Sequence, residues 1–274
     1  MNHLRDKIII GLLGMLIVSR IHGNTHQQTL FYSPDIETAI VIDAIKQAPL
    51  QFTYYFDLHH VLFRYCKKPF LSSATKIKKK TKFFFQGLRV AFSKNFWKNA
   101  HQLHKGGIKV TEAYLGSLEK YKTLHQGLIQ FMNDMYIPDQ KMYDHIAVLK
   151  KDSHDIFLLS NIGPKLLADL QEKYPAFFVN FNRKTNTINY SPTTQTEWLS
   201  KPHITSYQHA LTIGNKSHAP WTCVFVDDKL ENIQGALKAG LNAILFVSPE
   251  QFKRDVQLLS KRFARIKTSK KISK

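Results

Sequence analysis

Four short segments of the chain follow one another in a fixed order and carry side chains that could do chemistry together. Asp57 ends one hydrophobic run, and Ser160 comes at the end of a second. Lys201 comes next, and the pair Asp227 and Asp228 ends a third run. A carboxylate can attack phosphorus, a hydroxyl and an ammonium group can bind phosphoryl oxygens, and adjacent carboxylates can hold a cation. These residue types therefore predict a site for Mg²⁺ and a phosphoryl group.

The elements that must position these residues alternate along the chain. The patterns predict strands over residues 52–58, 155–161, 176–181, 221–227 and 242–247, and helices over 35–48, 164–173, 202–213, 229–239 and 249–266. Such alternation favours a parallel sheet with right-handed crossovers. In an open α/β sheet, ligands bind at the carboxyl ends of the strands. The three hydrophobic runs would therefore deliver their polar residues to one edge.

The order and chemistry of the segments resemble the haloacid dehalogenase (HAD) superfamily, most of whose members are phosphatases. Residues 226–236 are similar to the fourth motif of that family almost position by position, and Lys201 and Pro202, followed by Tyr207, look like its third motif. The resemblance covers roughly residues 52–247. It implies an α/β fold: a Rossmann-like parallel sheet core with an inserted helical cap domain.

The resemblance also implies a role for each residue that would touch the phosphoryl group. Asp57 matches the nucleophile, which forms an aspartyl-phosphate. Ser160 and Lys201 match the residues that hold the phosphoryl oxygens, and Asn161 could offer its backbone N–H to the same group. Alone, each of these residues is also an ordinary feature of a turn or loop, so the prediction depends on their order.

The implied cofactor is Mg²⁺, held by Asp57, Asp228 and the backbone carbonyl of His59, with Asp227 and Asn232 in support. Adjacent carboxylates beside Asp57 would repel one another unless a cation lay among them. Mg²⁺ suits hard oxygen ligands and few protein groups, because it keeps several waters.

His59 departs from the family pattern, which usually has a second Asp as general acid and base at that position. An imidazole with an unperturbed pKa of about 6.5 allows either protonation state near neutrality. His60 stands where the family usually has Gly, so a positive φ there would strain the backbone. Three interpretations of His59 remain open: a general acid/base in a working phosphatase, a slow or retired enzyme that still binds phosphate, or another reaction such as C–halogen or C–P cleavage.

The domain organisation follows from the same patterns. Residues 1–23 have the charged, apolar and polar regions of a signal peptide, and the apolar run is too short to span a bilayer comfortably. Residues 24–62 and 143–274 form the predicted HAD-like core with a basic C-terminal tail, and residues 63–142 the helical cap. A cleaved signal would make the protein exported, periplasmic or secreted; otherwise it would be membrane-anchored or cytoplasmic.

The formal net charge of +19 favours acidic partners, although a general lysine bias with solvated faces would give the same balance. The basic run 76–82 beside Phe83–Phe85 could meet nucleic acid, but clustered Phe more often packs in a core, so nucleic acid is not favoured. Two functions of different classes remain. The chain is a phosphohydrolase acting on a small phosphorylated substrate, or a catalytically impaired protein that binds a phosphorylated or anionic partner.

Overall fold

The computed structural model describes residues 28–37, 39–47, 51–65, 133–162, 164–182 and 201–269. The predicted signal peptide, the basic run 76–82 and most of the predicted cap lie outside these described residues. Within them, no helix combines the length and apolar character needed to cross a membrane. Cys223 is buried and forms no disulfide.

A five-stranded sheet forms the centre of the molecule, in the order β1-β7-β6-β2-β5. The strands are β1 (Leu30–Phe31), β2 (Thr53–Phe56), β5 (Asp155–Leu158), β6 (Cys223–Asp227) and β7 (Asn242–Leu245). β2 pairs in parallel with both β5 and β6, and β6 pairs in parallel with β7, whereas β1 is antiparallel to β7. The predicted α/β class with a parallel sheet is confirmed, with one antiparallel edge strand added.

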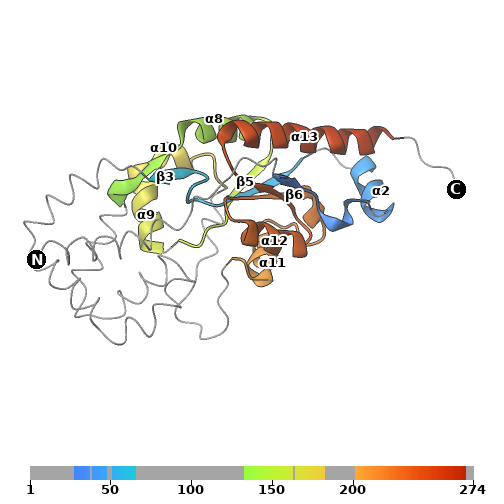
Figure 1. Cartoon of the computed structure of the whole chain (residues 1–274), viewed down its shortest axis with the longest axis horizontal. Helices are drawn as coiled ribbons and strands as arrows, with labels where there is room; N and C mark the ends of the chain where they lie inside the picture. The colour runs from blue at the N-terminus through green and yellow to red at the C-terminus, as the bar shows by residue number, and fades with distance from the viewer. Residues whose placement is uncertain are drawn as a thin grey trace, which may run out of the picture.

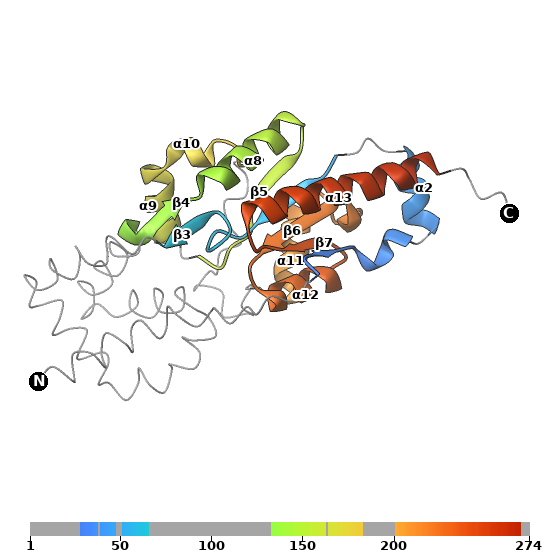
Figure 2. The same cartoon turned by 45° about the horizontal axis from the view of Figure 1, so that its top comes forward.

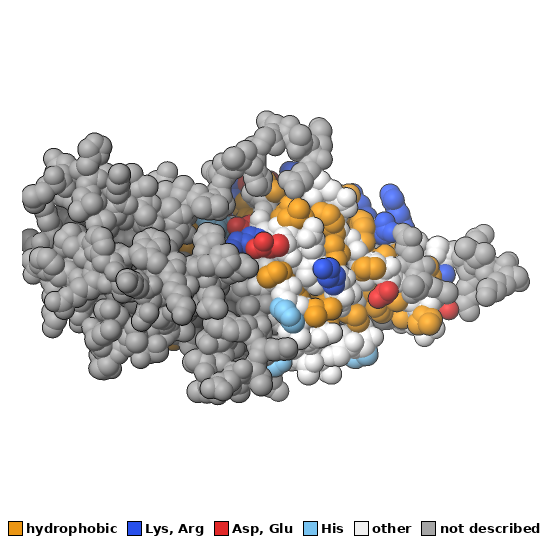
Figure 3. Space-filling view, turned by 60° about the horizontal axis from the view of Figure 1, so that its bottom comes forward, with side chains coloured by type: hydrophobic (Ala, Val, Ile, Leu, Met, Phe, Trp, Pro, Cys, Tyr) orange, Lys and Arg blue, Asp and Glu red, His pale blue; other side chains and the backbone are white. Residues whose placement is uncertain are grey.

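Helices cover both faces of the sheet (Figure 1). On one face lie α2 (Ala39–Gln47), α8 (Gln140–Lys151) and α13 (Pro249–Thr268), and on the other α11 (Ile204–Ile213) and α12 (Leu230–Lys238). Side chains alternate across β2, so Tyr54 and Phe56 pack on the first face and Tyr55 on the second. Two short 3₁₀ helices, Pro34–Glu37 and Pro220–Thr222, precede α2 and β6. On the face that α11 and α12 form, charged and histidine side chains lie among hydrophobic ones (Figure 3).

A second, two-stranded sheet joins β3 (Phe63–Tyr65) to β4 (Tyr136–Pro138) in antiparallel pairing. It lies beside α9 (Pro164–Lys173) and α10 (Pro175–Phe178), away from the C-terminus (Figure 2). Asp139 ties this sheet to the core, because its backbone N–H donates to Leu62 and its carboxylate caps α8 and pairs with Arg64 at 3.0 Å. The chain therefore leaves the core after β2 and returns to it at the same place.

Two predicted elements differ from the structure. The predicted strand over residues 176–181 is wrong, since Pro175–Phe178 form the short helix α10. Pro175 at the first helical position favours a helix, and a short apolar run has no period that tells strand from helix. The helix predicted over residues 35–48 is divided into the 3₁₀ helix Pro34–Glu37 and α2.

Candidate active site

Three strands bring the predicted polar residues to one edge of the sheet. Asp57 directly follows β2, Ser160 comes two residues after β5, and Asp227 is the last residue of β6. Because β2 lies between β5 and β6 and pairs with both in parallel, the three strands end side by side. The convergence of these residues at the carboxyl edge, which the sequence predicts, is present in the structure.

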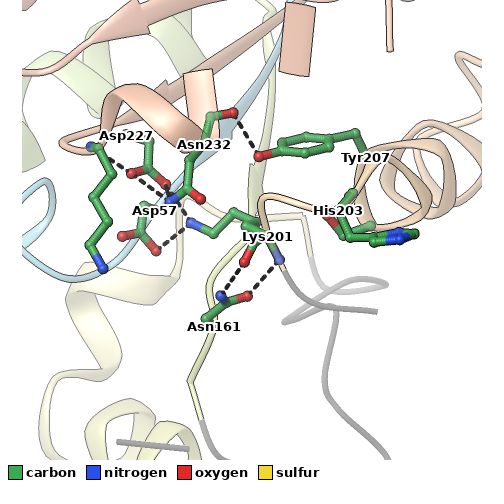
Figure 4. Close-up of polar contacts among 9 residues, drawn as sticks. Asp57, Asn161, Lys201, His203, Tyr207, Asp227 and Asn232 are labelled. Atoms are coloured by element: carbon green, nitrogen blue, oxygen red, sulfur yellow. Dashed lines mark hydrogen bonds and ion pairs between the residues drawn. The ribbon is translucent and has the colours of Figure 1, made fainter. Parts of the chain in front are cut away.

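Lys201 lies between two of the carboxylates (Figure 4). Its Nζ is 2.8 Å from Asp57 Oδ1 and 2.6 Å from Asp227 Oδ2. Burial alone would lower the pKa of Lys201, but the carboxylates of Asp227 and Asp57 outweigh it and raise that pKa. Burial opposes ionisation of Asp57, yet the charge of Lys201 prevails and lowers the pKa of Asp57 below its usual range. At neutral pH Asp57 is therefore an ionised carboxylate held by a buried ammonium.

Asn161 fixes the main chain of Lys201. Its side-chain amide donates from Nδ2 to the Lys201 carbonyl at 2.9 Å, and its Oδ1 accepts from the Lys201 backbone N–H at 3.0 Å. Figure 4 shows this reciprocal pair of bonds below Lys201. From the sequence, only the backbone N–H of Asn161 is expected to matter, so this role of its side chain is missed. Nothing in the sequence signals the pairing, which joins residues forty positions apart.

Asp227 is saturated with protein hydrogen bonds. Asn232 Nδ2 lies 3.0 and 2.9 Å from its two oxygens, and the backbone N–H of Lys229 donates to Oδ1 at 2.9 Å. Tyr207 holds Asn232 in turn, because its hydroxyl donates to the Asn232 carbonyl at 2.7 Å. Lys201 Nζ also donates to Oδ2 of Asp227. Asp227 therefore holds the ammonium of Lys201 in place, and Lys229 and Asn232 hold the carboxylate of Asp227.

Gly235 permits the close approach of α12 to the segment that carries Lys201. A Cβ atom at Gly235 would lie 2.4 Å from the Pro202 carbonyl oxygen and 2.7 Å from the Tyr207 ring. Real Cβ atoms do not come this close, so any other residue here would push α12 away from Pro202 and Tyr207. The glycine in the motif-like segment 226–236 thus has a packing reason.

The carboxylates of Asp57, Asp227 and Asp228 offer oxygens that lie within 4.8 Å of one another. Burial, followed by the charges of Asp57 and Asp227, raises the pKa of Asp228 to about 7. Such a cluster is costly to ionise without a counter-charge and is well suited to a hard divalent cation. Since the protein already occupies both oxygens of Asp227, the carboxylates of Asp57 and Asp228 fit the ligand role better, as the predicted ligand set has it.

His59 lies in the tight loop after β2, where Leu62 and Phe63 donate backbone hydrogen bonds to Leu58. Its ring packs 4.9 Å from the Tyr136 ring, and its Nε2 is buried with no hydrogen-bond partner among the described residues. Burial lowers the pKa of His59 to about 4. The expectation that the imidazole takes either protonation state near neutrality is therefore wrong for this structure, because its surroundings disfavour the charged form.

His60 has a φ of 61°, in the left-handed region that favours glycine. Because His stands where the family usually has Gly, the sequence predicts backbone strain if φ is positive, and the structure confirms the positive φ.

The hydroxyl of Ser160 is buried beside Asp57 and forms no hydrogen bond of good geometry within the described part of the chain. A buried hydroxyl without a partner is costly unless a ligand completes it. Ser160 and His59 therefore each present one unsatisfied polar atom in this region.

No family model matches the chain, and no curated protein matches it. Among solved structures, a predicted HAD-like hydrolase from Porphyromonas gingivalis aligns with a TM-score of 0.48 and 17% identity, covering 77% of this chain and 98% of that one. A HAD-superfamily hydrolase from Ehrlichia chaffeensis gives a TM-score of 0.44 and 16% identity over 77% and 99% of the two chains. A HAD family enzyme from Bacteroides thetaiotaomicron, solved as a magnesium complex, gives 0.44 and 17% over 71% and 92%.

Proposed function

We propose that the chain is a Mg²⁺-dependent phosphohydrolase of the HAD type, acting on a small phosphorylated substrate through an aspartyl-phosphate on Asp57. One observation supports this most: an ionised Asp57 lies beside a buried ammonium and a buried hydroxyl at the carboxyl edge of the sheet. A carboxylate, a cation and a hydroxyl donor are the groups that phosphoryl transfer to a carboxylate needs.

In the first step a carboxylate oxygen of Asp57 attacks phosphorus. The bond from phosphorus to the leaving oxygen breaks, and that oxygen departs with the bonding electrons and takes up a proton from solvent water. Lys201 and Ser160 hold the phosphoryl oxygens while charge develops on them. Asn161 keeps the main chain of Lys201 in place, because it bonds both its N–H and its carbonyl.

In the second step water attacks the phosphorus of the aspartyl-phosphate. The bond from phosphorus to the Asp57 oxygen breaks, inorganic phosphate leaves, and the carboxylate is restored. His59 accepts the proton of the water through Nε2, the ring nitrogen that lacks a partner in the described structure, and later releases it to solvent. The Asp57 carboxylate restored in the same step offsets the charge of the imidazolium, which burial alone disfavours. A neutral imidazole is better suited to accepting a proton from water than to donating one to a poor leaving group.

Asp57, Asp228 and the His59 carbonyl hold the metal in this proposal. Bound Mg²⁺ supplies positive charge that offsets the carboxylate cluster and the phosphoryl oxygens. The raised pKa of Asp228 supports a cation there, since the same repulsion that disfavours its ionisation favours metal binding. The acidic pair also favours phosphoryl transfer over C–halogen cleavage, which in this family does not need the metal.

The test is hydrolysis of a generic aryl phosphate by the parent protein, Asp57→Asn and His59→Asp, each with and without Mg²⁺. The proposal predicts turnover by the parent that is lost in Asp57→Asn and on chelation of the metal. Hydrolysis that survives both changes would contradict it.

A second function has its own supporting observation, which is the burial of His59 in an uncharged state. A chain that had lost its general acid would still bind a phosphorylated or anionic partner at the same edge. This alternative predicts no turnover by the parent but turnover by His59→Asp, so the same experiment separates the two functions.

A further inference from the structure

Lys229 lies at the edge of the proposed site. It directly follows Asp228, occupies the N-cap position of α12, and donates its backbone N–H to Asp227 Oδ1 at 2.9 Å. Its main chain is therefore fixed beside the carboxylates, while its side chain is exposed. The position differs from that of Lys201, which is buried on the floor of the site.

The carboxylates of the site do not need the ammonium of Lys229 to neutralise them. Lys201 is shared by Asp57 and Asp227, and the remaining carboxylate, Asp228, belongs to the proposed metal. Three carboxylates are thus balanced by one ammonium and one divalent cation. Within the described ranges, Lys229 forms no ion pair of its own, so its charge is available to a bound molecule.

The ammonium of Lys229 acts electrostatically on the reacting groups. Burial is the main cause of the lowered pKa of His59, and the charge of Lys229 contributes to it. Burial and the neighbouring carboxylates raise the pKa of Asp228, and Lys229 opposes that rise. The hydrogen bond from the Lys229 backbone N–H to Asp227 Oδ1 and its place directly after Asp228 put the residue beside any ligand bound at these carboxylates.

Lysine is a poor choice for this position on structural grounds alone. N-cap positions favour Ser, Thr, Asp and Asn, whose side chains accept a hydrogen bond from the first turn. The Lys229 side chain makes no such bond, and a cation near a helix N-terminus opposes the helix dipole. Residues that break a local rule without a structural gain are expected at functional sites.

We propose that Lys229 is a specificity-determining residue that binds a second anionic group of the substrate, a carboxylate or a further phosphoryl group, beside the scissile one. The inference rests on the proposed function, because the buried Lys201 and Ser160 serve the scissile phosphoryl group. The exposed ammonium of Lys229, at the edge of the site, is placed to bind a second anionic group of the substrate instead.

The experiment measures calorimetric binding of three non-hydrolysable probes to the full chain in Mg²⁺: phenylphosphonate, 4-carboxyphenylphosphonate and 1,4-phenylenebisphosphonate. The variants are Lys229→Met and Lys229→Glu. The control is Lys238→Met, which removes an exposed lysine from the last turn of the same helix. The ratio of affinities between a probe that carries a second anionic group and phenylphosphonate, which lacks one, cancels any change in metal occupancy.

The parent is expected to bind at least one of the two probes with a second anionic group about two- to fivefold more tightly than phenylphosphonate, as a partly exposed ion pair allows. Lys229→Met abolishes this preference, Lys229→Glu reverses it, and Lys238→Met keeps it. The difference between the carboxylate and bisphosphonate probes shows which anion is preferred. A preference that persists in Lys229→Met, its absence in the parent, or no binding of any probe would overturn the inference. If the preference for a second anionic group depends on Lys229 but the protein does not hydrolyse aryl phosphate, the inference stands and only the proposed function is contradicted.

Discussion

Lys201 Nζ lies 2.8 Å from Asp57 Oδ1 and, at the same time, 2.6 Å from Asp227 Oδ2. One buried ammonium is therefore shared by two carboxylates, which lie at the ends of two neighbouring strands. The arrangement keeps Asp57 ionised and oriented, and it connects the strand that carries Asp57 to the strand that carries the acidic pair. Removing the shared cation would leave two buried like charges facing each other.

Replacing Lys201 with Met should therefore affect both stability and activity. The free energy of unfolding should fall by about 3–5 kcal/mol, as when one partner of a buried ion pair is removed. Hydrolysis should fall at least about 100-fold, because the phosphoryl oxygens lose their buried cation. Urea denaturation and aryl phosphate kinetics measure the two effects. The double variant Lys201→Met/Asp227→Asn should regain part of the stability and none of the activity; no regain would show that lost packing, not charge, is the cause.

Asn161→Ala removes the two hydrogen bonds that fix the main chain of Lys201. The unfolding free energy should drop by about 1–3 kcal/mol, and kcat should fall about 10- to 100-fold because Lys201 is no longer held in place. Gln208→Ala, an exposed change on α11, is the matched control and should alter neither. An Asn161→Ala protein with the parent kcat would argue that Lys201 is positioned without Asn161.

Asp228→Asn should have opposite effects with and without metal. Burial and the neighbouring carboxylates raise the pKa of Asp228 to about 7, so its destabilisation of the metal-free protein grows as the pH rises above the unfolded-chain value of about 3.9 and is complete above the folded-state value. Neutralising it at pH 8 should stabilise the metal-free protein by on the order of 1–2 kcal/mol, after solvent screening, and abolish the stabilisation that Mg²⁺ gives the parent. Thermal melts with chelator and with Mg²⁺ measure both. Glu231→Gln, a nearby exposed acid, should change neither, and an undiminished Mg²⁺ effect in Asp228→Asn would rule out this ligand.

Much of the site could be predicted from the sequence, because strand ends are local features. The hydrophobic run up to Asp57 and the one up to Asp227 each mark a strand, and parallel pairing then determines where their carboxylates meet. The three-residue strands β3 and β4 could not be found this way, since each exists only by pairing with the other. The side-chain role of Asn161 was equally hidden, because its partner is the main chain of Lys201.

The state of His59 also required the three-dimensional structure. Its neighbours in sequence say nothing of Tyr136, whose ring covers it from β4 and helps bury it. Burial is a property of the packed molecule, so the sequence could supply only the ordinary pKa of an imidazole, about 6.5.

His154 gives a pH dependence of stability that is independent of the site. Its Nδ1 accepts a hydrogen bond from the Phe52 backbone N–H at 3.2 Å, and burial lowers its pKa below the usual value. The unfolded chain therefore binds a proton more readily than the folded one. The contribution of His154 is present above about pH 6.5 and is lost as the pH falls toward the lowered folded-state value.

Urea denaturation between pH 7.5 and 5 tests this contribution. His154→Asn should lose less stability over that range than the parent, since it takes up no proton. His218→Asn, which alters an exposed histidine, should follow the parent. Identical pH slopes for His154→Asn and the parent would remove His154 as the source.

The most direct test of the central claim is to trap the covalent intermediate. The protein is mixed with an aryl phosphate and Mg²⁺, quenched in acid within one turnover, digested and examined by mass spectrometry. We predict one phosphoryl group on the peptide that contains Asp57, absent from Asp57→Asn and from a sample quenched before substrate is added. Release of inorganic phosphate with no phosphoryl group on that peptide, or with the group on Asp227 or Asp228 instead, would contradict the account.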